Sequence, residues 1–397
     1  MPKSTNRLKT NKHTSYLDYA SSVSPNPSSI HSAGVEAREK LENARGVVAR
    51  ILSARPQEII FTSGGTESNN IAIQGIVMGV GISKLPHIIT TNIEHPSVLE
   101  TFKLLAERNL ARISIVPVEA NGIVDPKKIR KEIKKNTVLV SVMYANNEIG
   151  TIQPIREIGK AIRHYKKHSK RNDIFFHTDA VQGANYLDLS VERLGVDLLT
   201  LSGSKIEGAG SPKTGVVGRV GVLYKKKSVP LVNIFGGGNQ EWGLRPGTEN
   251  LPEIIKFAAA LQYAQKIKEK EAKRLTQLRD YFMNQLFHSN ILTNFRMTIN
   301  GDSKNRLPNN INITIPHIPS DLLVIELSVH GIMASSKSAC KSGDGKASYV
   351  IRAINKNIKD TDGSLRFSLG RQTTKKDIDY TLKVLSKILL KLKKWYT

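Results

Sequence analysis

Two motifs in this chain place side chains suited to a phosphate-bearing aromatic cofactor directly after apolar runs. In Ser63-Gly64-Gly65-Thr66-Glu67, the glycines let the backbone approach a phosphate, and the helix that follows would offer free N–H groups beside the Thr66 hydroxyl. Asp179 follows the apolar run 174–178 and precedes Gln182; a carboxylate at a strand end can keep a pyridinium nitrogen protonated. Taken singly, a structural glycine turn explains the first motif better, and a helix-capping aspartate explains the second at least as well.

A lysine past another apolar run adds the third chemical group. Lys205 ends the motif Leu201-Ser202-Gly203-Ser204-Lys205, where small neighbours leave its amine room to form a Schiff base with an aldehyde. Most lysines are simply solvated, so Lys205 alone would indicate little. A phosphate cradle, a pyridinium partner and a reactive lysine at successive strand ends together predict pyridoxal phosphate, because that cofactor requires all three.

The only cysteine of the chain, Cys340, lies in a run of small and polar residues, 335–345. Such a run cannot pack a core, so we expect a surface loop with an exposed thiol, whose thiolate form Lys337 and Lys341 would favour. Further along, Arg366 offers a guanidinium that can bind an α-carboxylate through two hydrogen bonds. The alternatives are an incidental exposed cysteine and an arginine held in a structural ion pair.

These residues require a sheet that brings several strand ends together. Between residues 34 and 225, apolar runs alternate with amphipathic stretches, a pattern typical of a mostly parallel sheet whose strands are connected through helices. Several runs are apolar throughout, as in strands buried on both faces. The expected strands are 59–62, 87–90, 113–116, 138–143, 174–178, 198–201 and 220–224, and helices are expected at 34–54, 67–80, 97–109 and 154–169. The fold class is therefore α/β.

The pattern changes near residue 250. A long helix is expected from Pro252 to Ser289, then a strand at 311–315 in a smaller α+β region, and an amphipathic helix at 374–396 that begins with a capping box. We expect three parts. They are an N-terminal arm, 1–21, that joins the small domain; a large cofactor-binding domain, 22–250; and a small C-terminal domain, 251–397, that carries the Cys340 loop.

Composition limits the partners and the cellular setting. The 397 residues carry a formal net charge of +25, but the basic residues are spread over helix faces such as 127–131 and 391–394. Direct nucleic-acid binding is therefore not expected; an acidic or RNA partner surface is the alternative. A single cysteine excludes an internal disulfide and an all-cysteine metal cage, so we expect no metal and a reducing, cytoplasmic setting. No apolar run approaches the length of a membrane helix, and an organelle-targeting segment before Tyr16 is the alternative to a cytoplasmic protein.

The sequence resembles the NifS/IscS-type cysteine desulfurases, members of the aminotransferase class V group of fold-type I pyridoxal-phosphate enzymes. The resemblance runs through nearly the whole chain and is carried by ordered blocks: YLDYA at 16–20, NPSSIH at 26–31, FTSGGTESN at 61–69, EH at 94–95, NNEIG at 146–150, DAVQ at 179–182, RPGTEN at 245–250, the Cys340 loop and RFSLGR at 366–371. It implies a large domain with a mostly parallel seven-stranded sheet and a smaller α+β C-terminal domain.

The resemblance also implies roles for particular residues. His95 would stack on the cofactor ring and shuttle protons, and Asn147 and Gln182 would bond its phenolic oxygen. Arg366 and Asn147 would bind the substrate, and Thr248 would reach in from the partner subunit of a homodimer. The phosphate would be held by Gly65, Thr66, Ser202 and Ser204, and the pyridinium by Asp179.

The reaction that the resemblance implies starts when L-cysteine displaces Lys205 from the cofactor. Lys205 then removes the Cα proton, the Cys340 thiolate attacks the substrate sulfur, and alanine leaves. The persulfide on Cys340 passes to a sulfur acceptor, such as an iron–sulfur scaffold or a tRNA-thiolation carrier. The resemblance also allows a transient iron–sulfur cluster contact at Cys340.

The chain departs from the family pattern near the expected site. Ser204 replaces a histidine, a helix is missing between Ala20 and Asn26, the turn 207–218 is longer, and Lys337 replaces a glycine. Two rival functions follow. One is another class V activity, such as a selenocysteine lyase or an aminotransferase-like enzyme; the latter does not need Cys340. The other is a non-catalytic homologue that serves as a scaffold or an RNA-associated protein.

Overall fold

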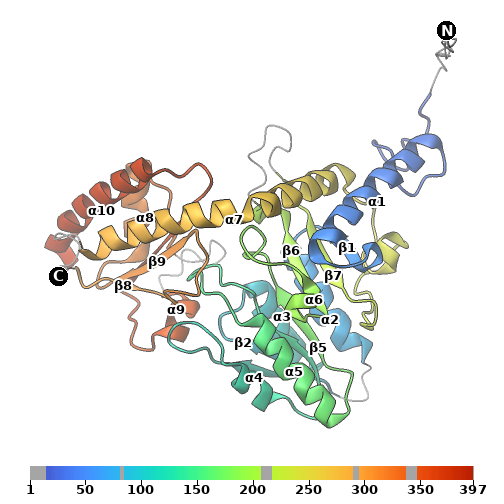
Figure 1. Ribbon diagram of the computed structural model, residues 1–397, viewed down its shortest axis with the longest axis horizontal. Helices are drawn as coiled ribbons and strands as arrows, with labels where there is room; N and C mark the ends of the chain where they lie inside the picture. Colours follow the sequence, from blue (N-terminus) through green and yellow to red (C-terminus); the bar gives the residue numbers. More distant parts are fainter. Residues whose placement is uncertain (1–14, 81–84, 207–216, 289–294, 337–346, 397) are drawn as a thin grey trace, which may run out of the picture.

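A computed structural model describes residues 15–80, 85–206, 217–288, 295–336 and 347–396. Figure 1 shows two regions bridged by one long helix: a larger region that holds the central sheet, and a smaller region that ends at the C-terminus. Cys340 and most of the turn 207–218 lie outside the described residues, so the predictions made for them are not addressed by the structure.

The larger region is built on a seven-stranded sheet with the order β1-β7-β6-β5-β4-β2-β3. Neighbouring strands are parallel from β6 to β3, whereas β7 is antiparallel to both β1 and β6. The predicted α/β fold with a mostly parallel seven-stranded sheet is confirmed. The strands are β1 (Ile59–Thr62), β2 (His87–Thr91), β3 (Arg112–Val116), β4 (Thr137–Ser141), β5 (Phe175–Asp179), β6 (Leu198–Ser202) and β7 (Gly221–Lys225).

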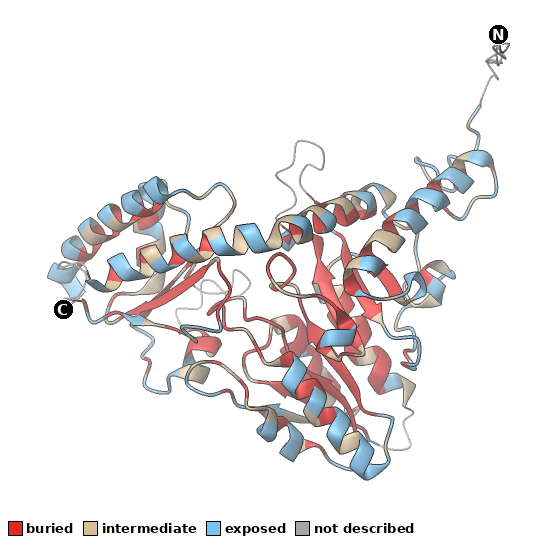
Figure 2. Cartoon of the chain, in the orientation of Figure 1, coloured by how far each residue is buried: buried red, intermediate tan, exposed pale blue. Residues whose placement is uncertain are grey.

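Two hydrophobic cores cover the two faces of this sheet, which explains why its central strands are apolar throughout. Successive residues alternate between the cores: Leu139 packs with α2 and α3, while Val140 packs on the opposite face, where α1 and α5 lie. Figure 2 shows the central strands buried and the outer helix faces exposed. The helices of this region are α1 (Ser32–Leu52), α2 (Gly65–Gly79), α3 (Pro96–Glu107), α4 (Pro126–Glu132), α5 (Ile155–Ser169) and α6 (Val191–Leu194).

Helix α7 (Leu251–His288) connects the two regions, and it begins where the sequence pattern changes. Its first half contributes Phe257 and Leu261 to a core of the large sheet, and its second half contributes Phe282 and Leu286 to the core of the smaller region. A three-stranded antiparallel sheet, ordered β10-β9-β8, forms the centre of the smaller region. Its elements are β8 (Thr298–Ile299), β9 (Asn310–Ile315), α8 (Ser320–Val329), α9 (Tyr349–Ile354), β10 (Gly363–Ser368) and α10 (Lys375–Tyr396).

The described part of the N-terminal arm precedes α1. Asp18 accepts hydrogen bonds from Ser21 and Ser29 and lies 3.1 Å from His31 Nε2. The division into 1–21, 22–250 and 251–397, with the arm joined to the small domain, stays a prediction. In the described part of the chain, no helix is long and apolar enough to cross a membrane.

Candidate active site

A cavity of about 590 Å³ lies at the carboxyl ends of the parallel strands and is closed on one side by the smaller region. Parallel strands end at the same edge of a sheet, so β5 and β6 deliver Asp179 and Lys205 to one place. Arg366 enters from β10. All the predicted site residues line this cavity except Thr248, which is exposed elsewhere on the chain, and Cys340, which is not described.

Asp179 is a buried carboxylate at the end of β5. Its Oδ2 accepts a hydrogen bond from Asn69 Nδ2 at 2.7 Å, and its Oδ1 accepts one from the amide of Val181 at 3.0 Å. These two neutral donors orient the carboxylate without cancelling its negative charge. The residue can therefore pair with a cationic ring nitrogen.

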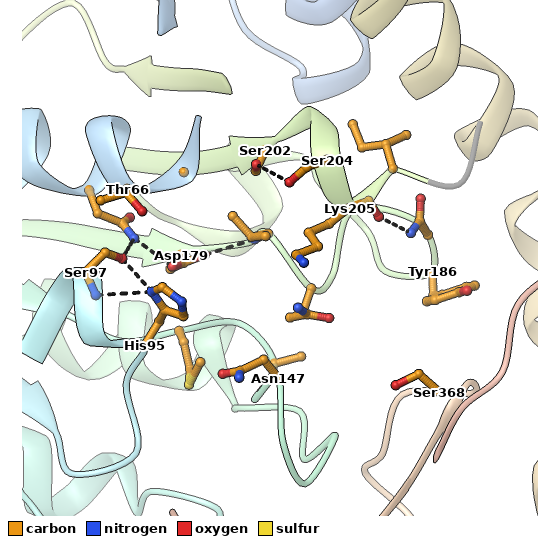
Figure 3. A pocket seen from close by; sticks show the side chains of 18 of the residues that line it. Thr66, His95, Ser97, Asn147, Asp179, Tyr186, Ser202, Ser204, Lys205 and Ser368 are labelled. Atoms are coloured by element: carbon orange, nitrogen blue, oxygen red, sulfur yellow. Dashed lines mark hydrogen bonds between the residues drawn. The ribbon is translucent and has the colours of Figure 1, made fainter. Parts of the chain in front are cut away.

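The start of α2 forms an anion cradle opposite the end of β6. Gly65 is the first residue of the helix, and a Cβ added there would lie 3.0 Å from Val181 Cγ2 and 3.4 Å from Ser202 Cβ. Thr66, Ser202 and Ser204 line the same part of the cavity, and the hydroxyl oxygens of the two serines are 3.3 Å apart (Figure 3). Free helix N–H groups and three hydroxyls make a donor set for phosphate.

His95 is held on the opposite wall of the cavity. The Ser97 amide donates to His95 Nδ1 at 3.1 Å, so in the neutral ring Nε2 carries the proton. Burial lowers the pKa of His95, with Lys205 contributing and the Asp179 carboxylate opposing. Asn69 Nδ2 donates to both Ser97 Oγ (2.8 Å) and Asp179 (Figure 3). This one amide therefore connects Ser97, which holds His95, with the Asp179 carboxylate.

Lys205 ends the short turn 203–205 after β6, and its side chain extends into the cavity (Figure 3). Its backbone carbonyl accepts a hydrogen bond from Asn185 Nδ2 at 2.8 Å. This contact fixes the backbone of the lysine and leaves its amine exposed to the cavity.

Arg366 is half-buried at the border of the two regions. Its Nη1 donates to the backbone carbonyl of Asn147 at 3.0 Å, and its Nη2 donates to Ser335 Oγ at 3.1 Å. Burial lowers the pKa of its guanidinium, and the Glu148 carboxylate acts in the opposite direction. Among the described residues Arg366 forms no ion pair, which argues against the alternative of a structural salt bridge.

Four residues that line this cavity each have a buried side-chain atom with no hydrogen-bond partner among the described residues. They are Arg366 (Nε), Asn69 (Oδ1), Asn147 (Oδ1) and Asn309 (Oδ1). Buried polar atoms of this kind are costly unless something satisfies them, and their concentration in the walls of one cavity indicates a polar site. The Arg366 guanidinium in that site suits a carboxylate.

Sequence reasoning gave no role to Asn69, Ser97, Asn185 or Asn309. Asn69 belongs to the block 61–69, but its position between Asp179 and Ser97 depends on a contact across 110 residues. Asn185 and Asn309 carry no motif that distinguishes them from the other asparagines of the chain. Only the fold brings these amides to the cavity.

A helix-start anion cradle, a buried carboxylate and a free lysine at neighbouring strand ends of this sheet define a fold-type I pyridoxal-phosphate enzyme. The donor set fits the cofactor, since each of its three polar parts has a matching group. The chain belongs to the aminotransferase class-V family, whose profile matches residues 5–381.

Comparison with known proteins confirms the resemblance inferred from the sequence. The chain is 43% identical to the cysteine desulfurase IscS of Dictyoglomus turgidum over 93% of this chain and 88% of that protein. It is 40% identical to IscS of Methanosarcina thermophila, over 95% and 88% of the two chains. Among solved structures, a NifS-like protein is 34% identical with a TM-score of 0.81, covering 92% of each chain. SspA in complex with cysteine is 29% identical, with a TM-score of 0.70 over 88% of this chain and 92% of that one.

Proposed function

We propose that this protein is a cysteine desulfurase that converts L-cysteine to L-alanine and retains the sulfur as a persulfide on Cys340. The observation that carries the proposal is that one cavity contains the Lys205 amine, the Asp179 carboxylate and the Arg366 guanidinium. The guanidinium suits the α-carboxylate of an amino acid beside an amine able to move its Cα proton. Relatives named cysteine desulfurase support the choice of amino acid.

The path of the chain toward Cys340 supports the same substrate. Ser335 and Arg366 exchange backbone hydrogen bonds of 3.1 and 2.7 Å, and Ser364 Oγ donates to the Ser336 carbonyl at 2.9 Å. The last described residues before the cysteine segment are therefore anchored beside the proposed carboxylate site.

In this proposal, different residues of the cavity bind different parts of the cofactor. Gly65, Thr66, Ser202 and Ser204 hold the phosphate, Asp179 holds the pyridinium, and Asn147 and Gln182 bond the phenolic oxygen. His95 stacks on the ring. When bound, pyridoxal phosphate supplies an electron sink for the pair released at the substrate Cα.

The chain's own groups then handle binding and proton transfer. Arg366 holds the α-carboxylate with charge-assisted hydrogen bonds, and the Lys205 amine takes the Cα proton. The Cys340 thiolate attacks the substrate sulfur, so an S–S bond forms while the Cβ–S bond breaks and its electron pair stays with the carbon fragment. A proton delivered to Cβ and a proton returned to Cα from the Lys205 ammonium yield alanine. His95, neutral because burial lowers its pKa, can hold a proton on Nε2 during these transfers.

The finer parts of the proposal concern assembly and setting. We propose a homodimer in which Thr248 reaches the phosphate of the partner subunit, since Thr248 is exposed and lines no part of its own cavity. The persulfide passes to an acceptor protein of iron–sulfur cluster assembly or tRNA thiolation. A thiol that alternates between free and persulfide forms needs reducing surroundings, so we propose the cytoplasm.

The test is to assay alanine and sulfide from L-cysteine for wild type, Cys340→Ala and a matched control, Ser342→Ala, after confirming the visible absorbance of bound cofactor in each. We expect wild type and Ser342→Ala to form both products and Cys340→Ala to form neither above background. Full turnover by Cys340→Ala would reject the proposal in favour of another class V activity. Failure of wild type to bind the cofactor would select the non-catalytic alternative.

A further inference from the structure

A buried ion pair outside the cavity joins α1 to the loop that contains Thr248. Arg45 is 2% exposed and Glu241 is 4% exposed, and neither lines the cavity. Arg45 Nη1 and Nη2 donate to the two carboxylate oxygens of Glu241 at 2.8 and 2.7 Å. The Phe61 amide donates to Glu241 Oε2 at 2.8 Å as well. A buried, bidentate ion pair of this kind forms only in a narrow range of geometries, so it fixes the positions of the two residues.

The loop adopts unfavourable backbone angles where it makes this contact. Glu241 and Trp242 both have left-handed conformations, with φ values of 49° and 57°, although neither is glycine. The Arg45 guanidinium lies between the Trp242 ring, at 4.6 Å from the centroid, and the Phe61 ring, at 4.9 Å. Strained non-glycine residues persist only where surrounding contacts hold them, and here the ion pair and the two rings provide those contacts.

Beyond this strained turn, the chain is held again before it reaches Thr248. Arg245 Nε donates to Glu67 Oε1 at 2.8 Å, and the Gly247 amide donates to Gln240 Oε1 at 3.1 Å. The segment 244–250 is therefore held both by the 240–243 turn and by Glu67 of α2. Thr248 itself is exposed and is not among the residues that line the cavity of its own chain.

The neighbouring phosphate cradle of the same chain does not depend on the ion pair to the same degree. β1 is paired along its length with β7, and Thr62 Oγ1 lies 2.8 Å from Ser68 Oγ at the start of α2. These contacts hold the cradle in addition to the bond from the Phe61 amide to Glu241. Loss of the ion pair should therefore displace the Thr248 segment and leave the chain's own cradle in place.

We infer that Arg45 and Glu241 are positioning residues that act on the active site of the partner subunit by presenting Thr248 to its cofactor phosphate. The inference rests on the proposed dimer with Thr248 acting between subunits. It assigns to a buried pair in one subunit a role in cofactor binding by the other.

The experiment uses heterodimers of the full chain, purified through two different affinity tags. In the first heterodimer, one subunit carries Lys205→Ala and the other Glu241→Gln. In the second, one subunit carries both substitutions and the other is wild type, so the overall composition is identical. A parallel pair of heterodimers replaces Glu241→Gln with Thr248→Ala. Cofactor affinity and alanine formation are measured for all four.

We expect the first heterodimer to retain about half of wild-type turnover. Its one site with Lys205 receives Thr248 from the subunit in which Glu241 is unchanged. The second should resemble the Glu241→Gln homodimer, whose cofactor dissociation constant we expect to rise at least about tenfold. Equal activity of the two heterodimers, higher activity of the second, or wild-type cofactor affinity in the Glu241→Gln homodimer would overturn the inference.

The Thr248 pair separates failure of the inference from failure of the proposed dimer. If the Thr248→Ala heterodimers show the expected order and the Glu241→Gln heterodimers do not, only the inference fails. If the Thr248→Ala heterodimers show the reverse order, Thr248 acts in its own subunit and both ideas fail. Should Glu241→Gln not fold, Arg45→Lys replaces it, since lysine keeps the charge but cannot make the two-pronged contact.

Discussion

Glu94 is a buried carboxyl group next to His95, and its protonation should make stability depend on pH. Its exposure is 0%, and its Oε1 accepts hydrogen bonds from Thr91 Oγ1 at 2.6 Å and from the Met143 amide at 3.0 Å. Its Oε2 has no hydrogen-bond partner among the described residues. Burial raises the pKa of Glu94 from 4.5 to about 8, and the nearby Asp179 carboxylate adds to the rise.

The raised pKa of Glu94 corresponds to a free-energy cost that grows with pH. Below 4.5 both the folded and the unfolded chain carry the proton, so this group contributes nothing. Between 4.5 and 8 only the folded chain keeps it, and the free energy of unfolding falls by about 1.4 kcal/mol per pH unit. The total decrease in the free energy of unfolding is about 5 kcal/mol above pH 8, and the decrease at pH 7 is about 3 kcal/mol.

Glu94→Gln should remove this dependence, because glutamine has the shape and hydrogen-bonding groups of a protonated glutamate. We expect the variant to exceed the free energy of unfolding of wild type by about 1 kcal/mol at pH 5 and by about 3 kcal/mol at pH 7. The assay is urea unfolding of the cofactor-free proteins from pH 5 to 9, followed by circular dichroism, with the exposed Glu107→Gln as control. A difference between Glu94→Gln and wild type that stays constant across this range would refute the reasoning.

Three further substitutions test the cavity. Arg366→Ala should lower kcat/KM for L-cysteine by roughly 10- to 100-fold, because a charge-assisted hydrogen bond contributes about 1.5–3 kcal/mol, while cofactor absorbance remains; unchanged kcat/KM would contradict the carboxylate assignment. Asp179→Asn should slow exchange of the alanine Cα proton with deuterium by roughly 100-fold or more, measured by proton NMR, because a neutral amide does not keep the pyridinium protonated; an unaltered exchange rate would reject that role. Ser204→Ala should raise the cofactor dissociation constant by roughly 2- to 10-fold, measured by fluorescence titration, since one neutral hydrogen bond is lost; no change would mean that Ser204 does not touch the phosphate.

Local pattern was sufficient for the strands of the larger region. Each of the seven strands forms within two residues of its predicted bounds, because strands buried on both faces must be apolar throughout. The positions of Asp179 and Lys205 followed from the same pattern, since the carboxyl ends of parallel strands meet at one edge. The antiparallel β7 was not foreseen, because an apolar run does not reveal its direction.

The smaller region shows where local pattern was not enough. The sequence identified Arg366 as a carboxylate-binding candidate but not the strand β10 on which it lies, and its place in the cavity depends on pairing with β9, where Arg366 faces Asn312. Strands β8 and β10 are short or interrupted by polar residues, so their periodicity is weak.

The sequence by itself determined the α/β class, the cofactor chemistry and the family, because glycine, carboxylate and lysine motifs at strand ends are local features. Only the tertiary structure decided which amides support those groups and which loops they depend on. Asn69 meets Asp179 across 110 residues, and Arg45 meets Glu241 across 196. Contacts of that kind arise from the packing of whole elements against each other, and no short stretch of sequence contains both partners.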